Sequence, residues 1–154
     1  MKVVGLDLGG TKIAAGVFDG KRLLSKVVVP TPKEGGERVA EALAEAAERA
    51  EREAGVRGEA IGLGTPGPLD FRRGVIRFAP NIPGVQDFPI RRILEEATGR
   101  PVFLENDANA AALGECWIGA GKDVDDLVLL TLGTGIGGGI ISGGRVLHGF
   151  VGMA

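Results

Sequence analysis

The segment Asp7-Leu8-Gly9-Gly10-Thr11-Lys12 combines residue types that could bind phosphate and a metal ion. Its glycines expose backbone N–H groups and let the main chain approach an anion closely. Thr11 contributes a hydroxyl, Lys12 a cation, and Asp7 a carboxylate that could hold Mg²⁺ through water. Aspartate and glycine are also common in simple turns, but the combination of donors, cation and carboxylate favours a phosphate-binding turn.

The start of the chain is repeated further along the sequence. A shift of about 124 positions superimposes it on the stretch around Leu132-Gly133-Thr134-Gly135-Ile136-Gly137-Gly138-Gly139. We therefore predict two copies of one unit made of three strands and two glycine turns. A flexible linker would also be rich in glycine, but β-branched residues flank this run and argue against a linker. The residues predicted for the second phosphate loop are Gly133, Thr134, Gly135, Gly137 and Gly138.

Asp107 follows the apolar segment 102–104, after Glu105 and Asn106, and opens an alanine-rich segment. An aspartate at this place is usually a cap that accepts hydrogen bonds from the first N–H groups of a helix. On the residues alone, the cap interpretation is favoured over a catalytic role.

The hydrophobic periodicity predicts strands that alternate with helices, which indicates an α/β fold with helices packed on a mixed sheet. Asp19-Gly20 is a hairpin signal, Gly55 and Gly99 are expected to stop helices, and a small hairpin is expected around Gly74. The region 65–89, rich in proline and glycine, is predicted to be an ordered binding loop. The predicted strands are 2–8, 12–18, 22–29, 60–64, 102–104, 127–132, 136–142 and 145–148, and the predicted helices are 36–54, 90–98 and 106–118.

The composition is that of an ordinary globular protein, with 154 residues, 44% hydrophobic, 25% charged and a net charge of −2. No apolar run approaches the roughly 18 residues that span a bilayer, and no leader segment is evident. We therefore expect a cytoplasmic protein that does not bind membranes. The sequence also has no basic cluster, so we expect no binding to nucleic acid. Arginine outnumbers lysine and glutamine occurs once, which fits a thermophile or a GC-rich genome equally well.

Three motifs together resemble the ROK family of sugar kinases and repressors, and bacterial glucokinases in particular. They are the segment from Asp7 to Lys12, the segment Glu105-Asn106-Asp107-Ala108-Asn109-Ala110, and the run from Leu132 to Gly139. The loop Pro80-Asn81-Ile82-Pro83-Gly84 also resembles a loop of those glucokinases. The resemblance implies an actin/hexokinase-like (ribonuclease H-like) fold, with ATP between two domains and a sugar in the cleft.

The resemblance also implies roles for single residues. Asp107 matches the general base that accepts the proton of the sugar 6-hydroxyl, which reverses the preference for a cap. Asn81 and Asn106 would bind sugar hydroxyls, and the backbone around Gly67 would close the pocket. The two glycine turns would hold the phosphates of ATP, with Mg²⁺ near Asp7. The implied reaction is the phosphorylation of a hexose, with glucose as the expected substrate.

The predicted domains are 1–118, a small α/β domain for sugar and phosphate, and 119–154, the opening strands of a second, truncated domain. In relatives, the stretch matching Gly152-Met153-Ala154 continues into a Gly-Glu-x-Gly-His segment and a cysteine cluster that binds zinc. We therefore expect the chain to lack part of the active site, to have little kinase activity alone, and to leave zinc to the missing part.

Two alternatives to a kinase follow from the same resemblance. A non-catalytic sugar sensor is one, but there is no room before Lys2 for a DNA-binding region, and Asp7 and Asp107 favour chemistry. An actin-like assembly domain, which would hydrolyse ATP without sugar, is the other. The sequence leaves the hexose, the phosphate donor and the oligomeric state open. A homo-oligomer is compatible with the final strands, which we expect to be uncovered.

Overall fold

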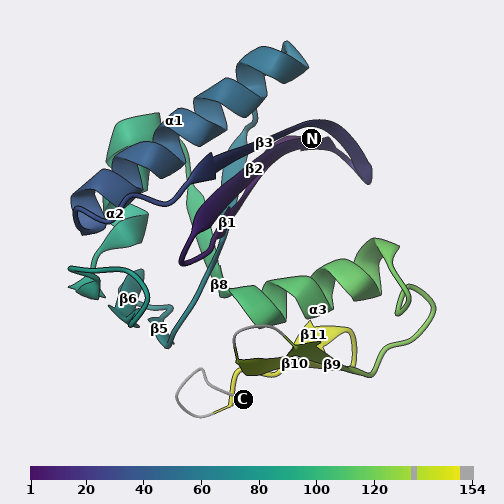
Figure 1. Ribbon diagram of the computed structural model, residues 1–154. Helices are drawn as coiled ribbons and strands as arrows, with labels where there is room; N and C mark the ends of the chain where they lie inside the picture. The colour runs from purple at the N-terminus through teal and green to yellow at the C-terminus, as the bar shows by residue number, and fades with distance from the viewer. Residues whose placement is uncertain (133–134, 150–154) are drawn as a thin grey trace. The chain divides into compact units, whose positions relative to one another are not determined.

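A computed structural model describes residues 1–132 and 135–149 of the chain (Figure 1). The chain forms two compact units, residues 1–105 and 106–154, which are described separately below. The predicted functional domains 1–118 and 119–154 stay a prediction. Within the described residues, no helix is both long and apolar enough to cross a bilayer.

The first unit is built on a five-stranded mixed sheet with the strand order β3-β2-β1-β4-β8. Strand β1 lies at the centre, antiparallel to β2 on one edge and parallel to β4 on the other. The predicted hairpin at Asp19-Gly20 is confirmed, since Gly20 has a φ of 56° in the turn between β2 and β3. The strands are β1 (Lys2–Leu8), β2 (Lys12–Asp19), β3 (Arg22–Pro30), β4 (Ala60–Thr65) and β8 (Val102–Asn106).

Two helices of the first unit begin and end as the sequence predicts. Helix α1 (Gly36–Ala54) packs on β1, β2 and β3, and its alanine-rich face is buried against them. Helix α2 (Ile90–Thr98) packs on α1. Gly55 and Gly99 end these helices in the left-handed conformation, which glycine adopts without the steric cost of a Cβ. The core lies between α1 and the sheet, where Val4, Leu43 and Leu63 are almost fully buried.

The loop predicted at 65–89 contains a small antiparallel sheet with the order β5-β6-β7. Strands β5 (Leu69–Asp70) and β6 (Val75–Phe78) form the hairpin expected around Gly74, whose φ is 68°. The third strand, β7 (Gln86–Phe88), was not predicted, because three residues beside prolines carry too little periodicity. The loop is therefore an ordered element that can hold side chains in place.

The second unit contains α3 (Asp107–Ile118) and a sheet of β9 (Leu127–Leu132), β10 (Ile136–Ser142) and β11 (Arg145–Val146). Its three antiparallel strands have the order β11-β10-β9, which matches β3-β2-β1 and confirms the duplication. The last strand ends at Val146, so its predicted extension to 148 is wrong.

The expectation that this second sheet is bare is wrong for one of its faces. Helix α3 packs against β9 and β10, and alternate residues of β9 are half-buried beneath it. The opposite face stays exposed at Val128, Leu130 and Leu132. The prediction failed because it considered only the residues that follow the sheet, whereas the covering helix precedes it in the sequence.

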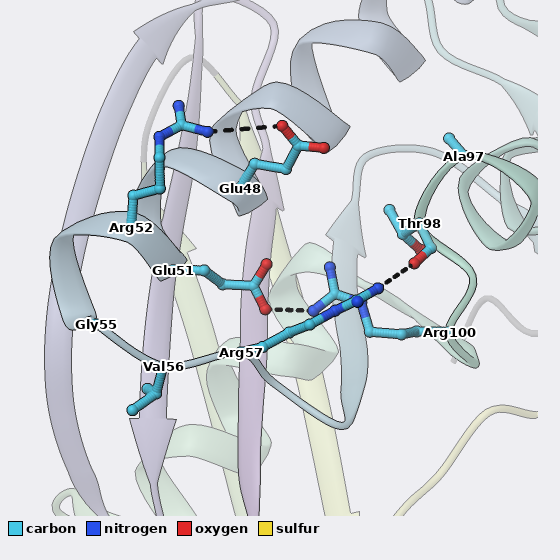
Figure 2. Close-up of a pocket in the computed structure, with 9 residues that line it drawn as sticks. All are labelled: Glu48, Glu51, Arg52, Gly55, Val56, Arg57, Ala97, Thr98 and Arg100. Carbon is cyan, nitrogen blue, oxygen red and sulfur yellow. Dashed lines mark hydrogen bonds and ion pairs between the residues drawn. The ribbon is translucent and has the colours of Figure 1, made fainter.

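The ends of α1 and α2 meet in the first unit around a buried ion pair, shown in Figure 2. The guanidinium of Arg100 donates to the Glu51 carboxylate and, over 3.1 Å, to the carbonyl of Gly58. The same carboxylate accepts the Gly58 N–H at 2.6 Å. The side chains of Arg100 and Glu51 are only 7% and 11% exposed, beside a pocket of about 500 Å³. The pair therefore connects α1 to the segments that enter β4 and β8.

We predict that Glu51→Ala destabilises the chain by about 3 kcal/mol, because it leaves the charge of Arg100 buried without its partner. The matched control is Glu48→Ala, which removes an ion pair with Arg52 in which both side chains are mostly exposed, and which should cost about 1 kcal/mol or less. Urea unfolding of both variants measures the difference. Equal losses for the two variants would show that burial does not matter at Glu51.

The carboxylate of Asp126 ties the start of β9 to the turn after β10. It accepts hydrogen bonds from the Gly143 N–H at 3.0 Å and the Ser142 hydroxyl at 2.9 Å, and these bonds lower the pKa of Asp126 below its ordinary value. A lowered pKa in the folded state stabilises the fold above the unfolded pKa, and this contribution is lost as the pH falls through the folded pKa.

We therefore predict that Asp126→Ala lowers the unfolding midpoint at neutral pH, and that the difference from the wild type shrinks below about pH 4, where the unfolded carboxyl is protonated. Thermal unfolding at a series of pH values, with the exposed Asp123→Ala as control, measures this effect. A difference that stays constant down to the lowest pH would contradict the prediction.

Candidate functional site

The turn between β1 and β2 carries the first predicted phosphate motif. Asp7 is exposed near the end of β1, and Lys12 is exposed as the first residue of β2. The N–H of Gly9 donates to the carbonyl of Lys12 over 2.9 Å and closes the turn. A Cβ at Gly9 would lie 2.9 Å from that carbonyl oxygen, so this tight closure requires a glycine.

The carbonyl groups of this turn bond to the chain segment that follows β3. The hydroxyl of Thr31 donates to the carbonyl of Gly9 at 2.7 Å, and the Thr31 N–H donates to the carbonyl of Thr11 at 3.0 Å. The ammonium group of Lys33 donates to the carbonyl of Gly10. All three carbonyls of the turn therefore have partners on one short segment.

Asn81, the predicted sugar ligand, lies directly against the turn between β1 and β2. A Cβ built on Gly10 would be 2.9 Å from the Cβ of Asn81, closer than real side chains approach. Asn81 is exposed on a hydrogen-bonded turn between β6 and β7, which the buried Ile82 anchors. The fold thus brings together two predicted site elements that are 71 positions apart in the chain.

Gly67 occupies a conformation that no other residue could adopt at this place. Its φ is 79°, and a Cβ there would lie 2.0 Å from the carbonyl oxygen of Phe78. The loop after β4 therefore passes directly over the end of β6. This end of β6 is close in sequence to Asn81. This contact explains why position 67 is a glycine, and the predicted role of its backbone in closing a sugar pocket stays a prediction.

The second unit places Asn106 and Asp107 at the start of α3. The cap of this helix is Asn106, whose Oδ1 accepts from the N–H groups of Ala108 at 3.0 Å and Asn109 at 3.3 Å. The Asp107 carboxylate accepts from the Ala108 N–H at 2.8 Å, and its residue is exposed. The cap interpretation that the residues alone favoured for Asp107 is therefore wrong in detail, because its neighbour takes that position.

Of the second predicted phosphate loop, Gly133 and Thr134 lie outside the described residues, and Gly135 is exposed. Gly137 and Gly138 lie within β10, where they pair with Thr131 and Leu130 of β9. A Cβ at Gly137 would meet the Thr131 hydroxyl at 2.6 Å, so a larger residue here would require the Thr131 side chain to move. Phosphate binding by these five residues stays a prediction.

In the described ranges, no group of three His, Cys, Asp or Glu side chains is arranged to hold a metal ion. Mg²⁺ in phosphate-transfer sites is typically bound by one or two carboxylates together with substrate phosphates and water. The exposed carboxylate of Asp7, beside the turn between β1 and β2, has the donor chemistry that such an ion prefers.

Sequence reasoning missed Thr31 and Lys33, which contact the turn but lie about twenty residues beyond it. The stretch Pro30-Thr31-Pro32 indicates only the end of a strand, and a lysine in a polar loop usually faces solvent. Their contacts depend on the pairing of β2 with β3, which brings position 31 beside position 11.

The chain is similar to known sugar kinases in sequence and in structure. It is 44% identical to a glucokinase from Thermotoga maritima over 156 residues, which cover 97% of this chain and 47% of that protein. A crystal structure of a ROK hexokinase from Thermus thermophilus matches with a TM-score of 0.93 and 85% identity, over 99% of this chain and 50% of that one.

A ROK family glucokinase from Streptomyces griseus, in complex with glucose and AMPPNP, matches with a TM-score of 0.92 and 44% identity, over 100% of this chain and 48% of that one. The chain thus spans about half the length of the relatives it matches. These likenesses confirm the predicted actin/hexokinase-like α/β fold with a mixed sheet and flanking helices.

The sequence pattern of the ROK family matches residues 3–154, which is nearly the whole chain. This match agrees with the three motifs and with the duplicated strand unit. The chain belongs to the ROK family.

Proposed function

We propose that this chain provides the sugar-binding and phosphate-binding half of an ATP-dependent hexose kinase that converts glucose to glucose 6-phosphate. The observation that carries the proposal is the contact of Gly10 with Asn81, because it joins a phosphate-type turn to a polar side chain suited to a sugar hydroxyl. The likeness to glucokinases supports the choice of a hexose. A cytoplasmic location and a homo-oligomer remain predictions.

The turn from Gly9 to Lys12 would bind the phosphates of ATP. Phosphoryl transfer depends mainly on positioning and on stabilising negative charge, which backbone N–H groups and a lysine can provide. In this proposal Lys12 supplies the cation, since it is exposed at the start of β2. Gly135 and the adjoining residues of the second copy would also bind phosphate.

Mg²⁺ would neutralise phosphate charge during the transfer, and Asp7 would hold it through water. The carboxylate of Asp7 is exposed and lies near the end of the central strand β1, where the turn begins. No other residue is needed for this role, because the phosphates themselves complete the coordination of such ions.

Asp107 is proposed as the general base that accepts the proton of the sugar 6-hydroxyl. Its carboxylate is exposed, and it lies in the first turn of α3, where the helix dipole favours a negative charge. Asn106 would bind a neighbouring sugar hydroxyl. Because its Oδ1 caps the helix, the proposal assigns this contact to the amide Nδ2 group.

The first experiment measures glucose-dependent ADP formation with Mg-ATP. It compares the 154-residue chain with a fusion of this chain to the C-terminal half of the Thermus thermophilus hexokinase, which matches it at 85% identity. We expect turnover by the fusion and little by the chain alone. Turnover of ATP without sugar would favour an actin-like domain instead, and glucose binding without turnover by the fusion would favour a sensor.

We predict that Asp107→Asn lowers the kcat of the fusion by about a hundredfold or more, since general base catalysis contributes roughly 10²–10⁴ in rate. The amide keeps the size of the side chain and its acceptor oxygen for the Ala108 N–H, so helix α3 should persist. Steady-state kinetics with circular dichroism as a folding check measures this. Asp123→Asn, an exposed aspartate in the same unit, is the control and should leave kcat unchanged.

We predict that Gly10→Ala lowers kcat/KM for glucose by about tenfold or more, because a misplaced binding group costs one to several kcal/mol. The added methyl would overlap the Cβ of Asn81 and displace that side chain. Gly62→Ala is the matched control, since nothing lies within 4 Å of a Cβ at Gly62 in the neighbouring strand β4. Glucose kinetics unchanged by Gly10→Ala would remove Asn81 from the proposed sugar site.

A further inference from the structure

Thr31 makes two of the three bonds that hold the carbonyls of the β1–β2 turn. Its hydroxyl bonds to Gly9 at 2.7 Å and its N–H to Thr11 at 3.0 Å, and the residue is only 5% exposed. The Gly10 carbonyl accepts from the exposed Lys33. The Thr31 side chain therefore holds the Gly9 end of the turn, its backbone holds the Thr11 end, and the solvated Lys33 side chain holds the middle.

The direction of these carbonyls determines where the N–H groups point. In a trans peptide, the C=O of one residue and the N–H of the next are antiparallel. With the carbonyls of Gly9 and Gly10 bonded to the segment after β3, the N–H groups of Gly10 and Thr11 must point away from that segment. Within the described part of the chain, neither N–H donates to another group. The turn thus presents two adjacent donors on one side, as an anion-binding backbone does.

The backbone at Thr31 is itself restricted by the residues beside it. Pro32 disfavours helical conformations at position 31 and keeps it extended, and Pro30 has a fixed φ at the end of β3. A β-branched threonine also has few accessible χ1 rotamers. The hydroxyl is therefore held in place before any ligand binds, so little entropy is lost when the turn is fixed.

We propose that Thr31 is a positioning residue, whose hydroxyl orients the N–H group of Gly10 toward the phosphates by holding the carbonyl of Gly9. This inference rests on the proposed function, because it assumes that phosphate binds at this turn. Thr31 does not touch the ligand and acts only through the backbone. Its hydroxyl, rather than its size, carries the effect.

The test is a titration of the ¹⁵N-labelled 154-residue chain with inorganic pyrophosphate, which follows the amide resonances of Gly10 and Thr11. Thr31→Val removes the hydroxyl at nearly constant volume and should weaken pyrophosphate binding by about tenfold, the value of one good hydrogen bond. Thr31→Ser retains the donor and should restore most of the affinity.

The matched control is Thr98→Val. The Thr98 hydroxyl is also buried and donates to a backbone carbonyl, that of Leu94, over 2.7 Å, but it lies at the end of α2. This variant should lower stability much as Thr31→Val does, while pyrophosphate affinity stays unchanged. An equal loss of affinity in both valine variants would show a general structural effect and overturn the proposal.

The outcomes separate the proposal from the function on which it rests. If the wild type binds pyrophosphate at Gly10 and Thr11, but Thr31→Val binds equally well, Thr31 has no positioning role and the proposed function stands. If the wild type shows no response at these amides, phosphate binding at this turn fails, and the inference about Thr31 fails with it.

Discussion

The hydrogen bonding of β1 along both of its edges is the constraint on which the first unit depends. Because β1 is antiparallel to β2, the chain must turn back sharply after Leu8, and the turn from Gly9 to Thr11 forms at that end of the sheet. Because β1 is also parallel to β4, the end of β4 comes to the same end of the sheet, with Gly64 beside Asp7. The loop that leaves β4 therefore starts next to the turn, and its later residue Asn81 can contact Gly10.

The two copies of the repeated unit use their glycines for different physical reasons. In the first copy, Gly9 and Gly10 lie in a turn where backbone and side chains approach too closely for a Cβ. In the second copy, Gly139 lies inside β10 beneath α3, where a Cβ would come within 2.8 Å of Ala112. The similar sequences thus produce the same strand topology. In the second sheet, small residues are also needed where α3 packs on the strands.

The helices and most strands could be predicted because their signals are local. Amphipathic spacing and a terminal glycine determine α1 and α2, and Gly20 determines the first hairpin. Features that depend on distant pairing could not be predicted. The support of the turn by Thr31 follows from the pairing of β2 with β3, and the cover of the second sheet by α3 follows from tertiary packing. At the start of α3, Asn106 and Asp107 are both good caps, and propensity alone could not decide between them.

The pair of Glu51 and Arg100 affects how the stability of the first unit depends on temperature. Both groups have lost nearly all their contact with water, so they stabilise the fold only as far as their attraction exceeds the cost of dehydration. The hydration of charged groups has a strongly negative entropy, so this cost decreases as the temperature rises. The junction of α1 with the segments entering β4 and β8 therefore contributes more to folding in hot solution than in cold solution.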